Sequence, residues 1–255
     1  MSFRIVIPAR FASTRLPGKP LRTIAGRPLI EHVHARATQA GASEVIVATD
    51  DERIAAACRG FGGVVAMTSP DHASGTDRLA EVASARGWPD DAIVVNVQGD
   101  EPLIPPAIIR QVAALLASAM AASVATLATP VRALAELLDP NVVKVVADRA
   151  GHALYFSRAP IPWQRDAAAG GTDAQRIAGA RRHLGLYAYR VAALRRLAAL
   201  APTALELTER LEQLRALEHG LVIAIADAVE VPGPGVDTES DLIEAERLVR
   251  AANRR

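Results

Sequence analysis

The sequence predicts an α/β protein built on a mostly parallel, twisted β-sheet flanked by helices. Three early runs are short and rich in Ile and Val, and each precedes a polar loop and then a helical pattern; they cover residues 3–7, 44–48 and 92–97. Continuous apolar runs of this length are typical of parallel strands buried on both faces. The intervening helices are the crossovers that parallel strands require.

The helical segments of the first half follow from periodicity and capping. Helical periodicity covers residues 29–40 and 52–59. Thr76 is placed to cap a third helix that runs from Asp77 to about Arg86. The first half of the chain is therefore expected to consist of repeated β-α units.

The pattern changes after Asn141. Two apolar runs, 142–146 and 152–156, flank a turn-forming stretch, which indicates a β-hairpin. Residues 164–180 are rich in Ala, Gly and charge and have no strong apolar period, so we expect a mobile loop or lid there. A strand at about 184–189 is then expected to return the chain to the sheet.

The C-terminal quarter is predicted to contain two helices and a strand. Leucines that recur at spacings of four and three predict a single helix over 203–220, ended by Gly220. A strand is expected over 221–231, followed by a Pro-Gly turn. The last helix is expected to begin at about Glu239 and to be capped by Thr238.

Composition limits the class of protein. Lys and Arg number 29 against 28 Asp and Glu, so there is no overall basic field to bind nucleic acid or an anionic membrane. The single cysteine, Cys58, fits a reducing compartment and a small core position. No stretch approaches the roughly 20 apolar residues of a membrane span, and the N-terminal apolar run is too short for a signal peptide. We therefore expect a cytoplasmic protein without membrane insertion.

A basic loop follows the first predicted strand. Arg10, Arg15 and Lys19 lie close together there, with Pro17 and Gly18 between them. Open α/β sheets bind ligands at the carboxyl ends of their strands, and cations beside a glycine-containing turn suit a triphosphate. Gly18-Lys19 is followed by Pro20 and lacks the upstream glycine of a P-loop, and no Gly-x-Gly-x-x-Gly follows any strand. The loop therefore predicts triphosphate binding of another type.

Two aspartates follow other predicted strands. Asp100 comes just after the buried run at 92–97, and Asp237 comes after the Pro-Gly turn. Mg²⁺ prefers one or two carboxylates together with phosphate oxygens and water. The pair therefore predicts a magnesium site beside the basic loop. The alternative for Asp237 is that it helps to cap the last helix.

Several motifs, in order along the whole chain, resemble those of the 3-deoxy-manno-octulosonate (Kdo) cytidylyltransferases, or CMP-Kdo synthetases. The resemblance is carried by Ile7-Pro8-Ala9-Arg10, Ser13-Thr14-Arg15-Leu16-Pro17-Gly18-Lys19-Pro20-Leu21, Ser74-Gly75-Thr76-Asp77-Arg78, Asn96-Val97-Gln98-Gly99-Asp100-Glu101-Pro102, Tyr155-Phe156-Ser157-Arg158, His183-Leu184-Gly185-Leu186-Tyr187, Leu211-Glu212-Gln213-Leu214-Arg215 and Gly235-Val236-Asp237-Thr238. Residues 166–181 contribute no motif.

The resemblance implies a Rossmann-like nucleotidyltransferase fold and the reaction of CTP with Kdo to give CMP-Kdo and diphosphate, for lipopolysaccharide synthesis. The anomeric hydroxyl would attack the α-phosphate in line, with Mg²⁺ as cofactor. It further implies one domain over residues 1–255, in which about 130–190 hold the hairpin, a small dimerisation lobe and the mobile loop. The expected partners are CTP, Kdo and a second copy of the chain.

The resemblance also assigns residues. Catalytic roles fall to Lys19, Arg15, Asp100 and Asp237, of which the two aspartates hold the metal. Nucleotide binding falls to Pro8, Ala9, Arg10, Ser13, Arg15, Lys19, Ser74 and Gln98. Sugar binding falls to Arg78, Gln98, His183, Tyr187, Glu212 and Gln213.

Alternative interpretations remain at several of these positions. Arg78 starts a helix and fits a solvated surface charge equally well, and Gln213 is favoured over Glu212 because the two point in different directions around a helix. His183 fits a structural histidine, and no second His or Cys stands at zinc-ligand spacing. The rival functions are cytidylyl transfer to a related acid sugar, such as 8-amino-Kdo or a sialic acid, and non-catalytic nucleotide binding.

Overall fold

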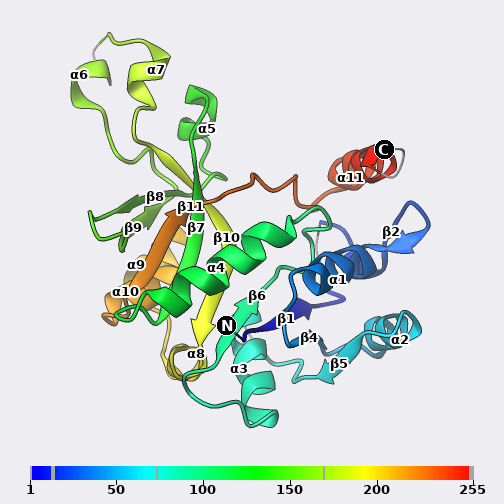
Figure 1. Ribbon diagram of the computed structural model, residues 1–255. Helices are drawn as coiled ribbons and strands as arrows, with labels where there is room; N and C mark the ends of the chain where they lie inside the picture. Colours follow the sequence, from blue (N-terminus) through cyan, green and yellow to red (C-terminus); the bar gives the residue numbers. More distant parts are fainter. Residues whose placement is uncertain (1, 13–14, 73, 169, 253–255) are drawn as a thin grey trace.

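The computed structural model describes residues 2–12, 15–72, 74–168 and 170–252. Its central sheet has the strand order β11-β7-β10-β6-β1-β4-β5 (Figure 1). The predicted early strands are β1 (Arg4–Ala9), β4 (Glu44–Thr49) and β6 (Ile93–Asn96), and β1 pairs in parallel with both of the others. β5 (Val64–Met67), which the sequence reading missed, extends the parallel part beyond β4. The mostly parallel sheet is confirmed.

The other half of the sheet is built around one reversed strand. β10 (Arg181–Arg190) lies between β6 and β7 (Val124–Pro130) and is antiparallel to both. β11 (Ile223–Asp227) pairs in parallel with β7 at the edge. The predicted strand at 221–231 was too long, because the chain leaves the sheet after Asp227 and crosses to the last helix (Figure 1).

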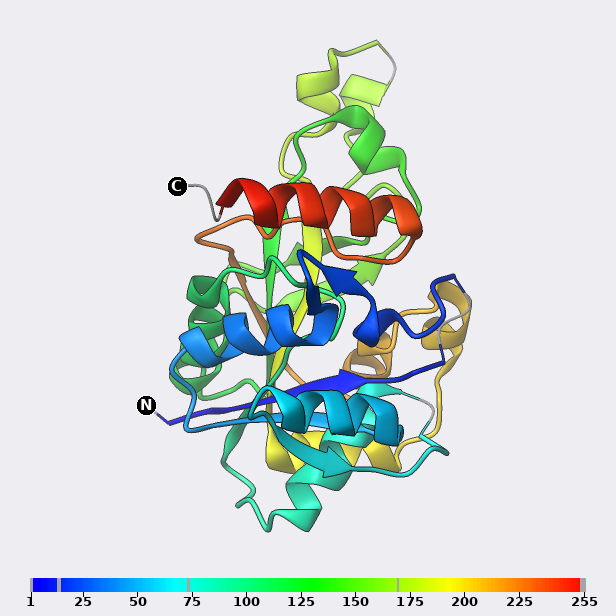
Figure 2. The ribbon, with the colours of Figure 1, turned by 90° about the vertical axis from the view of Figure 1, so that its right-hand side faces the viewer.

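Helices cover both faces of the sheet and divide the core in two. One hydrophobic cluster joins the sheet to α1 (Leu29–Gln39), α2 (Glu52–Gly60), α4 (Pro106–Ser118) and α11 (Glu239–Ala252). The other joins it to α3 (Gly75–Ala85), α8 (Val191–Ala199) and α10 (Gln213–Glu218). Figure 2 shows α11 above α1 on the first face. Cys58 is fully buried in the first cluster, as predicted.

Capping decides where two of these helices begin. The residue that caps α3 is Ser74, not Thr76, because Ser74 and Asp77 form a reciprocal capping box that satisfies two backbone N–H groups. At α11 the predicted cap is correct. The Thr238 hydroxyl accepts from the Asp241 N–H, and the Asp241 carboxylate accepts from the Thr238 N–H at 2.8 Å.

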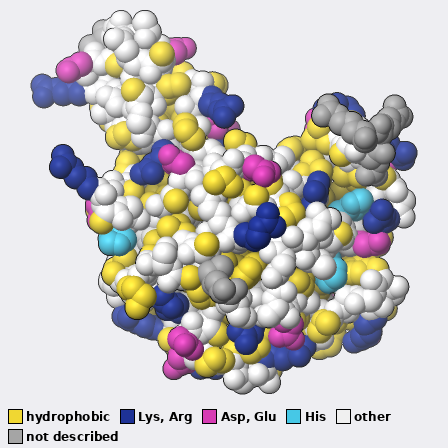
Figure 3. All heavy atoms as spheres, in the orientation of Figure 1, with side chains coloured by type: hydrophobic (Ala, Val, Ile, Leu, Met, Phe, Trp, Pro, Cys, Tyr) yellow, Lys and Arg dark blue, Asp and Glu magenta, His cyan; other side chains and the backbone are white. Residues whose placement is uncertain are grey.

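A lobe projects from the body at the far end of β7 and β10 (Figures 1 and 3). The predicted hairpin is confirmed as β8 (Lys144–Ala147) and β9 (Ala153–Ser157), and β8 also pairs with β10. Beyond it stand α5 (Leu134–Leu138) and two single-turn helices, α6 (Arg165–Ala168) and α7 (Asp173–Arg176). The predicted loop at 164–180 is thus partly helical, since Thr172 and Gln175 form a capping box around α7.

The predicted single helix over 203–220 is wrong. Two short helices, α9 (Ala204–Glu209) and α10, are separated by Arg210, whose backbone is left-handed at φ 54°. A left-handed residue cannot continue a right-handed helix, so the chain turns there. Leu211 and Leu214 are buried, whereas Leu207, which shared their spacing, is 56% exposed.

The remaining elements are short. η1 (Lys19–Leu21) is a single 3-10 turn, and β2 (Thr23–Ile24) and β3 (Arg27–Pro28) form a separate two-stranded ribbon. In the part of the chain that the structure describes, no helix has both the length and the hydropathy that a bilayer span needs.

Candidate active site

The basic loop and the two aspartates line one cavity of about 400 Å³ at the carboxyl ends of β1 and β6. The predicted nucleotide residues Pro8, Ala9, Arg10, Arg15, Lys19 and Gln98 all line it, together with Asp100 and Asp237. We call this cavity the basic cleft. Ser13 lies outside the described residues.

Gly18 sets the shape of the basic loop. Its backbone is left-handed at φ 65°, and an added Cβ would meet the Phe11 ring at 3.2 Å. The Gly18 N–H donates to Phe11 O at 3.2 Å, and the Leu21 N–H donates back to Gly18 O at 2.8 Å. The Arg53 guanidinium lies over the Phe11 ring, 3.3 Å from its centroid. This closed turn places Lys19 at the start of η1.

Lys19 lies between the two aspartates. Its Nζ donates to Asp100 Oδ2 at 2.7 Å and to Asp237 Oδ1 at 3.0 Å. Burial acts to lower the pKa of Lys19, but the two carboxylates outweigh burial and raise this pKa above its ordinary value. Lys19 is therefore fully charged at neutral pH.

The backbone holds the two aspartates at one place. The Val236 N–H donates to Asp100 O at 2.8 Å, which joins the two segments that carry them. Gly99 permits the loop after β6 to approach β1 closely, because a Cβ there would lie 2.7 Å from Pro8 O. Arg15 Nη2 lies 3.1 Å from Asp237 Oδ2. The capping alternative for Asp237 fails, since Thr238 and Asp241 cap α11 while the Asp237 carboxylate faces the cations.

The donor set of the basic cleft suits a hard cation shared with a phosphate. Among the described residues, no group of three or more His, Cys, Asp or Glu side chains could enclose a metal ion. Two carboxylates with open space beside them fit Mg²⁺, whose remaining ligands are usually phosphate oxygens and water. Arg10 adds a cation, because its Nη2 is buried and, within the described chain, has no hydrogen-bond partner.

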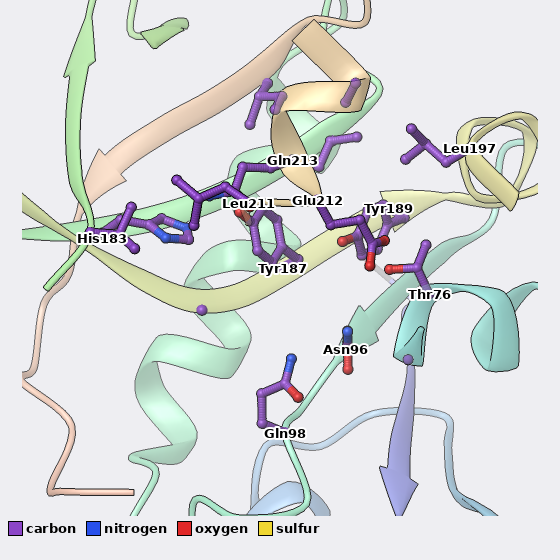
Figure 4. A pocket seen from close by; sticks show the side chains of 16 residues that line it. Thr76, Asn96, Gln98, His183, Tyr187, Tyr189, Leu197, Leu211, Glu212 and Gln213 are labelled. Atoms are coloured by element: carbon purple, nitrogen blue, oxygen red, sulfur yellow. The ribbon is translucent and has the colours of Figure 1, made fainter. Parts of the chain in front are cut away.

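A second cavity, of about 310 Å³, adjoins the first and shares Gly75 and Gln98 with it (Figure 4). β10 contributes His183, Tyr187 and Tyr189, and the start of α10 contributes Gln213 with Glu212 just before it. The predicted sugar residues Gln98, His183, Tyr187, Glu212 and Gln213 are thus brought together. We call this cavity the polar pocket.

His183 is a neutral hydrogen-bonding residue. Burial lowers the pKa of His183 to about 3. Thr126 Oγ1 lies 2.8 Å from Leu186 O and 3.0 Å from His183 Nε2. Because the one Thr126 proton serves the carbonyl, Nε2 is assigned as the donor to Thr126, and Nδ1 remains an acceptor for a ligand.

Glu212 is the acidic group of the polar pocket. Burial raises the pKa of Glu212, and the hydroxyls of Thr76 and Ser74 partly oppose that shift. Figure 4 shows Glu212, Thr76 and Tyr189 converging on one side of the pocket. The preference for Gln213 over Glu212 has no basis in the structure, because the helix break lets both side chains line the pocket.

The sequence reading missed Asn96, Thr76 and Tyr189 as lining residues. Asn96 is 4% exposed and its Oδ1 has no partner among the described residues; the same holds for the hydroxyl of Tyr187. Asn96 and Tyr187 face each other as Cα partners of β6 and β10. The sequence did contain a signal for Asn96. Asn96 and Gln98 are polar residues two positions apart in an otherwise apolar run, and residues at that spacing lie on the same face of a strand.

Arg78 and Ser74 lie outside both cavities. Arg78 is fully buried, pairs with Asp50 at 3.1 Å and donates to Thr68, so the surface alternative was wrong. Its sugar-binding role stays a prediction, although Arg78 is not among the lining residues of either cavity. Ser74 is occupied by its cap, although Gly75 beside it lines both cavities. The described lining of the polar pocket contains no Lys or Arg.

Comparisons with known proteins agree with this geometry. The family model described as "Cytidylyltransferase" matches residues 4–225. The 3-deoxy-manno-octulosonate cytidylyltransferase of Thioalkalivibrio sulfidiphilus is 57% identical over 98% of this chain and 100% of its own length. That of Halorhodospira halophila is 54% identical over 98% of both chains. A solved CMP:2-keto-3-deoxy-manno-octonic acid synthetase complexed with CTP superposes with a TM-score of 0.90, at 43% identity over 99% of this chain and 100% of that one.

Proposed function

The chain belongs to the 3-deoxy-manno-octulosonate cytidylyltransferases, and on that premise we propose that it transfers CMP from CTP to Kdo, releasing diphosphate. The observation that carries the proposal is the junction of two unlike cavities at Gly75 and Gln98. A basic cleft with two carboxylates suits a triphosphate, and a polar pocket with no Lys or Arg in its described lining suits a polyhydroxylated acceptor. The two reactants would therefore meet beside Gln98.

The basic cleft supplies charge neutralisation. Arg10, Arg15 and Lys19 would bind the phosphates, with Lys19 following the charge that moves onto the departing diphosphate. Asp100 and Asp237 are the residues that would hold Mg²⁺. When bound, the ion lowers the pKa of the attacking hydroxyl and neutralises phosphate charge. The residues of this chain then act mainly by positioning the two reactants in line.

The lining of the polar pocket determines the orientation in which Kdo would bind. The Kdo carboxylate is attached to the same carbon as the attacking hydroxyl, so the two lie together at the reacting end. Because the polar pocket has no cation in its described lining, we place the carboxylate at the junction, toward the basic cleft. The remaining hydroxyls then extend toward Asn96, His183, Tyr187 and Glu212.

The lobe is the proposed dimer contact. Leu138 is 47% exposed, and Leu154 and Trp163 are each 60% exposed. Large exposed apolar side chains in one region favour an interface, and a two-fold homodimer is the commonest assembly. Sedimentation of the protein over a range of concentrations tests this, and a monomer at all concentrations would exclude it. We further propose a role in lipopolysaccharide synthesis and a cytoplasmic location, where CTP is available.

One assay tests the reaction and its rivals. Diphosphate release is measured with CTP and, in parallel, with Kdo, 8-amino-Kdo or a sialic acid. We expect rapid release with Kdo and little with sialic acid. Equal or reversed rates would overturn the substrate assignment, and CTP binding without release from any acceptor would favour the non-catalytic alternative.

A further inference from the structure

The polar pocket depends on a helix break for two of its side chains. Glu212 and Gln213 follow the left-handed Arg210, which ends α9 and turns the chain before α10. Arg210 is exposed and is not a glycine, so its own conformation is unfavourable and must be stabilised by its surroundings. The contacts that hold this break therefore decide where Glu212 and Gln213 lie.

Two sets of contacts hold the break: Glu206 pairs with Arg215 across it, and Glu209, the last residue of α9, contacts β9 and the residue that follows β9. Glu209 Oε1 accepts from Ser157 Oγ at 2.6 Å, and its Oε2 accepts from the Arg158 N–H at 3.0 Å. Its backbone carbonyl accepts from Arg158 Nε at 2.7 Å. Burial acts to raise the pKa of Glu209, but these donors outweigh it and hold the pKa below its usual value. Glu209 is thus ionised and joined to β9 by both its side chain and its backbone.

A buried lysine contacts the same segment as Glu209. Lys144 is fully buried, and its Nζ donates to Arg158 O at 2.7 Å and to Asp139 O at 2.9 Å. Lys144 is the Cα partner of Ser157 in β9 and of Arg182 in β10. Arg182 directly precedes His183 in the sequence. One continuous set of contacts therefore runs from β10, through the hairpin, to the helix break.

We propose that Glu209 is a positioning residue for the acceptor sugar: it fixes the α9–α10 break against β9 and so holds Glu212 and Gln213 opposite His183 in the polar pocket. Glu209 does not line either cavity. Its effect is expected on the sugar acid alone, because the basic cleft is built from other segments. The inference rests on the proposed function for the identity of the acceptor.

The test compares Glu209→Gln with a matched control. Glu209→Gln keeps the size of the side chain but turns an N–H group toward donors that the carboxylate accepts from. These donors are the Tyr155 and Ser157 hydroxyls on one oxygen and the Arg158 N–H on the other. Glu218→Gln is the control, since Glu218 also accepts a backbone N–H across α9 and α10, from Leu205 at 3.3 Å, but at the far end of α10. We expect Glu209→Gln to raise the KM for Kdo at least tenfold, with the KM for CTP within twofold, and Glu218→Gln to change neither.

Ser157→Ala gives a second and milder route to the same answer. It is expected to raise the KM for Kdo less than Glu209→Gln does, and the double variant is expected to resemble Glu209→Gln alone, because both changes break the same contact. The inference is overturned if folded variants keep the wild-type KM for Kdo, or if both KM values rise equally. If Glu209→Gln does not fold, Ser157→Ala decides alone. Failure of the wild-type protein to release diphosphate would instead remove the proposed function.

Discussion

Lys19 Nζ lies 2.7 Å from Asp100 Oδ2, so the cation expected to bind phosphate is already paired with a carboxylate expected to bind metal. The pairing keeps both side chains in place before substrates arrive. A metal ion at Asp100 and a triphosphate at Lys19 would exchange these partners without large movements.

Lys19→Met is expected to lower kcat by about 100- to 1,000-fold, the usual effect of removing one donor that stabilises transition-state charge. Steady-state diphosphate release measures it. Arg22→Gln is the control, because Arg22 pairs with Glu239 outside the cleft, and it is expected to stay within twofold of wild type. Near-normal turnover of Lys19→Met would contradict the phosphate assignment.

Asp100→Asn is expected to leave CTP binding detectable while nearly abolishing diphosphate release, since the amide holds Mg²⁺ poorly in the transition state. Binding is measured by calorimetry and turnover by diphosphate release. Asp91→Asn serves as the control, because Asp91 is exposed and remote from both cavities. Substantial turnover of Asp100→Asn would refute the magnesium site.

Tyr187→Phe is expected to change stability and sugar binding in opposite directions. Without ligand the Tyr187 hydroxyl is buried and has no partner in the described chain, so its removal is expected to leave the thermal midpoint unchanged or higher. The KM for Kdo is expected to rise about tenfold through the loss of one hydrogen bond of roughly 1 to 1.5 kcal/mol. A lower midpoint with unchanged KM would show that the hydroxyl is structural.

Arg78→Met is expected to destabilise the protein by about 3 to 5 kcal/mol, because it removes one partner of a buried ion pair. The partner left behind is Asp50. Urea unfolding measures the loss, and Arg86→Met, which breaks an exposed pair with Glu44, is expected to cost less than about 1 kcal/mol. A selective rise in the KM for Kdo without loss of stability would return Arg78 to the sugar site.

His183 predicts a dependence of stability on pH. Its pKa is about 3 in the folded protein, against about 6.5 when unfolded, so below pH 6.5 the unfolded chain binds the extra proton. Stability therefore falls as the pH drops from about 6.5 toward 3, by up to about 1.4 kcal/mol per unit from this group. Urea unfolding of His183→Gln is expected to show a shallower loss over that window. Equal slopes would contradict a neutral His183 in the folded protein.

The parallel half of the fold was predictable because its signals are local. β1, β4 and β6 are apolar runs followed by loops, and the basic loop and Asp100 come directly after two of them. Their meeting in space follows from the rule that parallel strands end at one edge. The contact of Lys19 with Asp237 requires the segment before the last helix to return to the same edge of the sheet. The family resemblance implied this return, whereas the order of the predicted strands did not.

The errors have physical reasons that the sequence pattern does not contain. The leucines of 203–220 keep helical spacing through Arg210, so periodicity cannot reveal a left-handed residue stabilised by Glu209 and β9. Arg78 looks like a surface charge at a helix start, and only the approach of Asp50 and Thr68 from β4 and β5 explains its burial. The helix break at Arg210 and the burial of Arg78 both depend on contacts with other segments of the chain.

The position of β10 has a consequence for synthesis on the ribosome. β10 lies between β6 and β7, both of which precede it in the chain, so the sheet has a gap at its centre until Arg190 has been made. The part of the polar pocket that α10 contributes and Asp237 follow later still. Domains fold as units when their parts are available, so a nascent chain contains the basic loop and Asp100 before Asp237 and before a complete acceptor pocket. Catalysis is therefore confined to the finished chain.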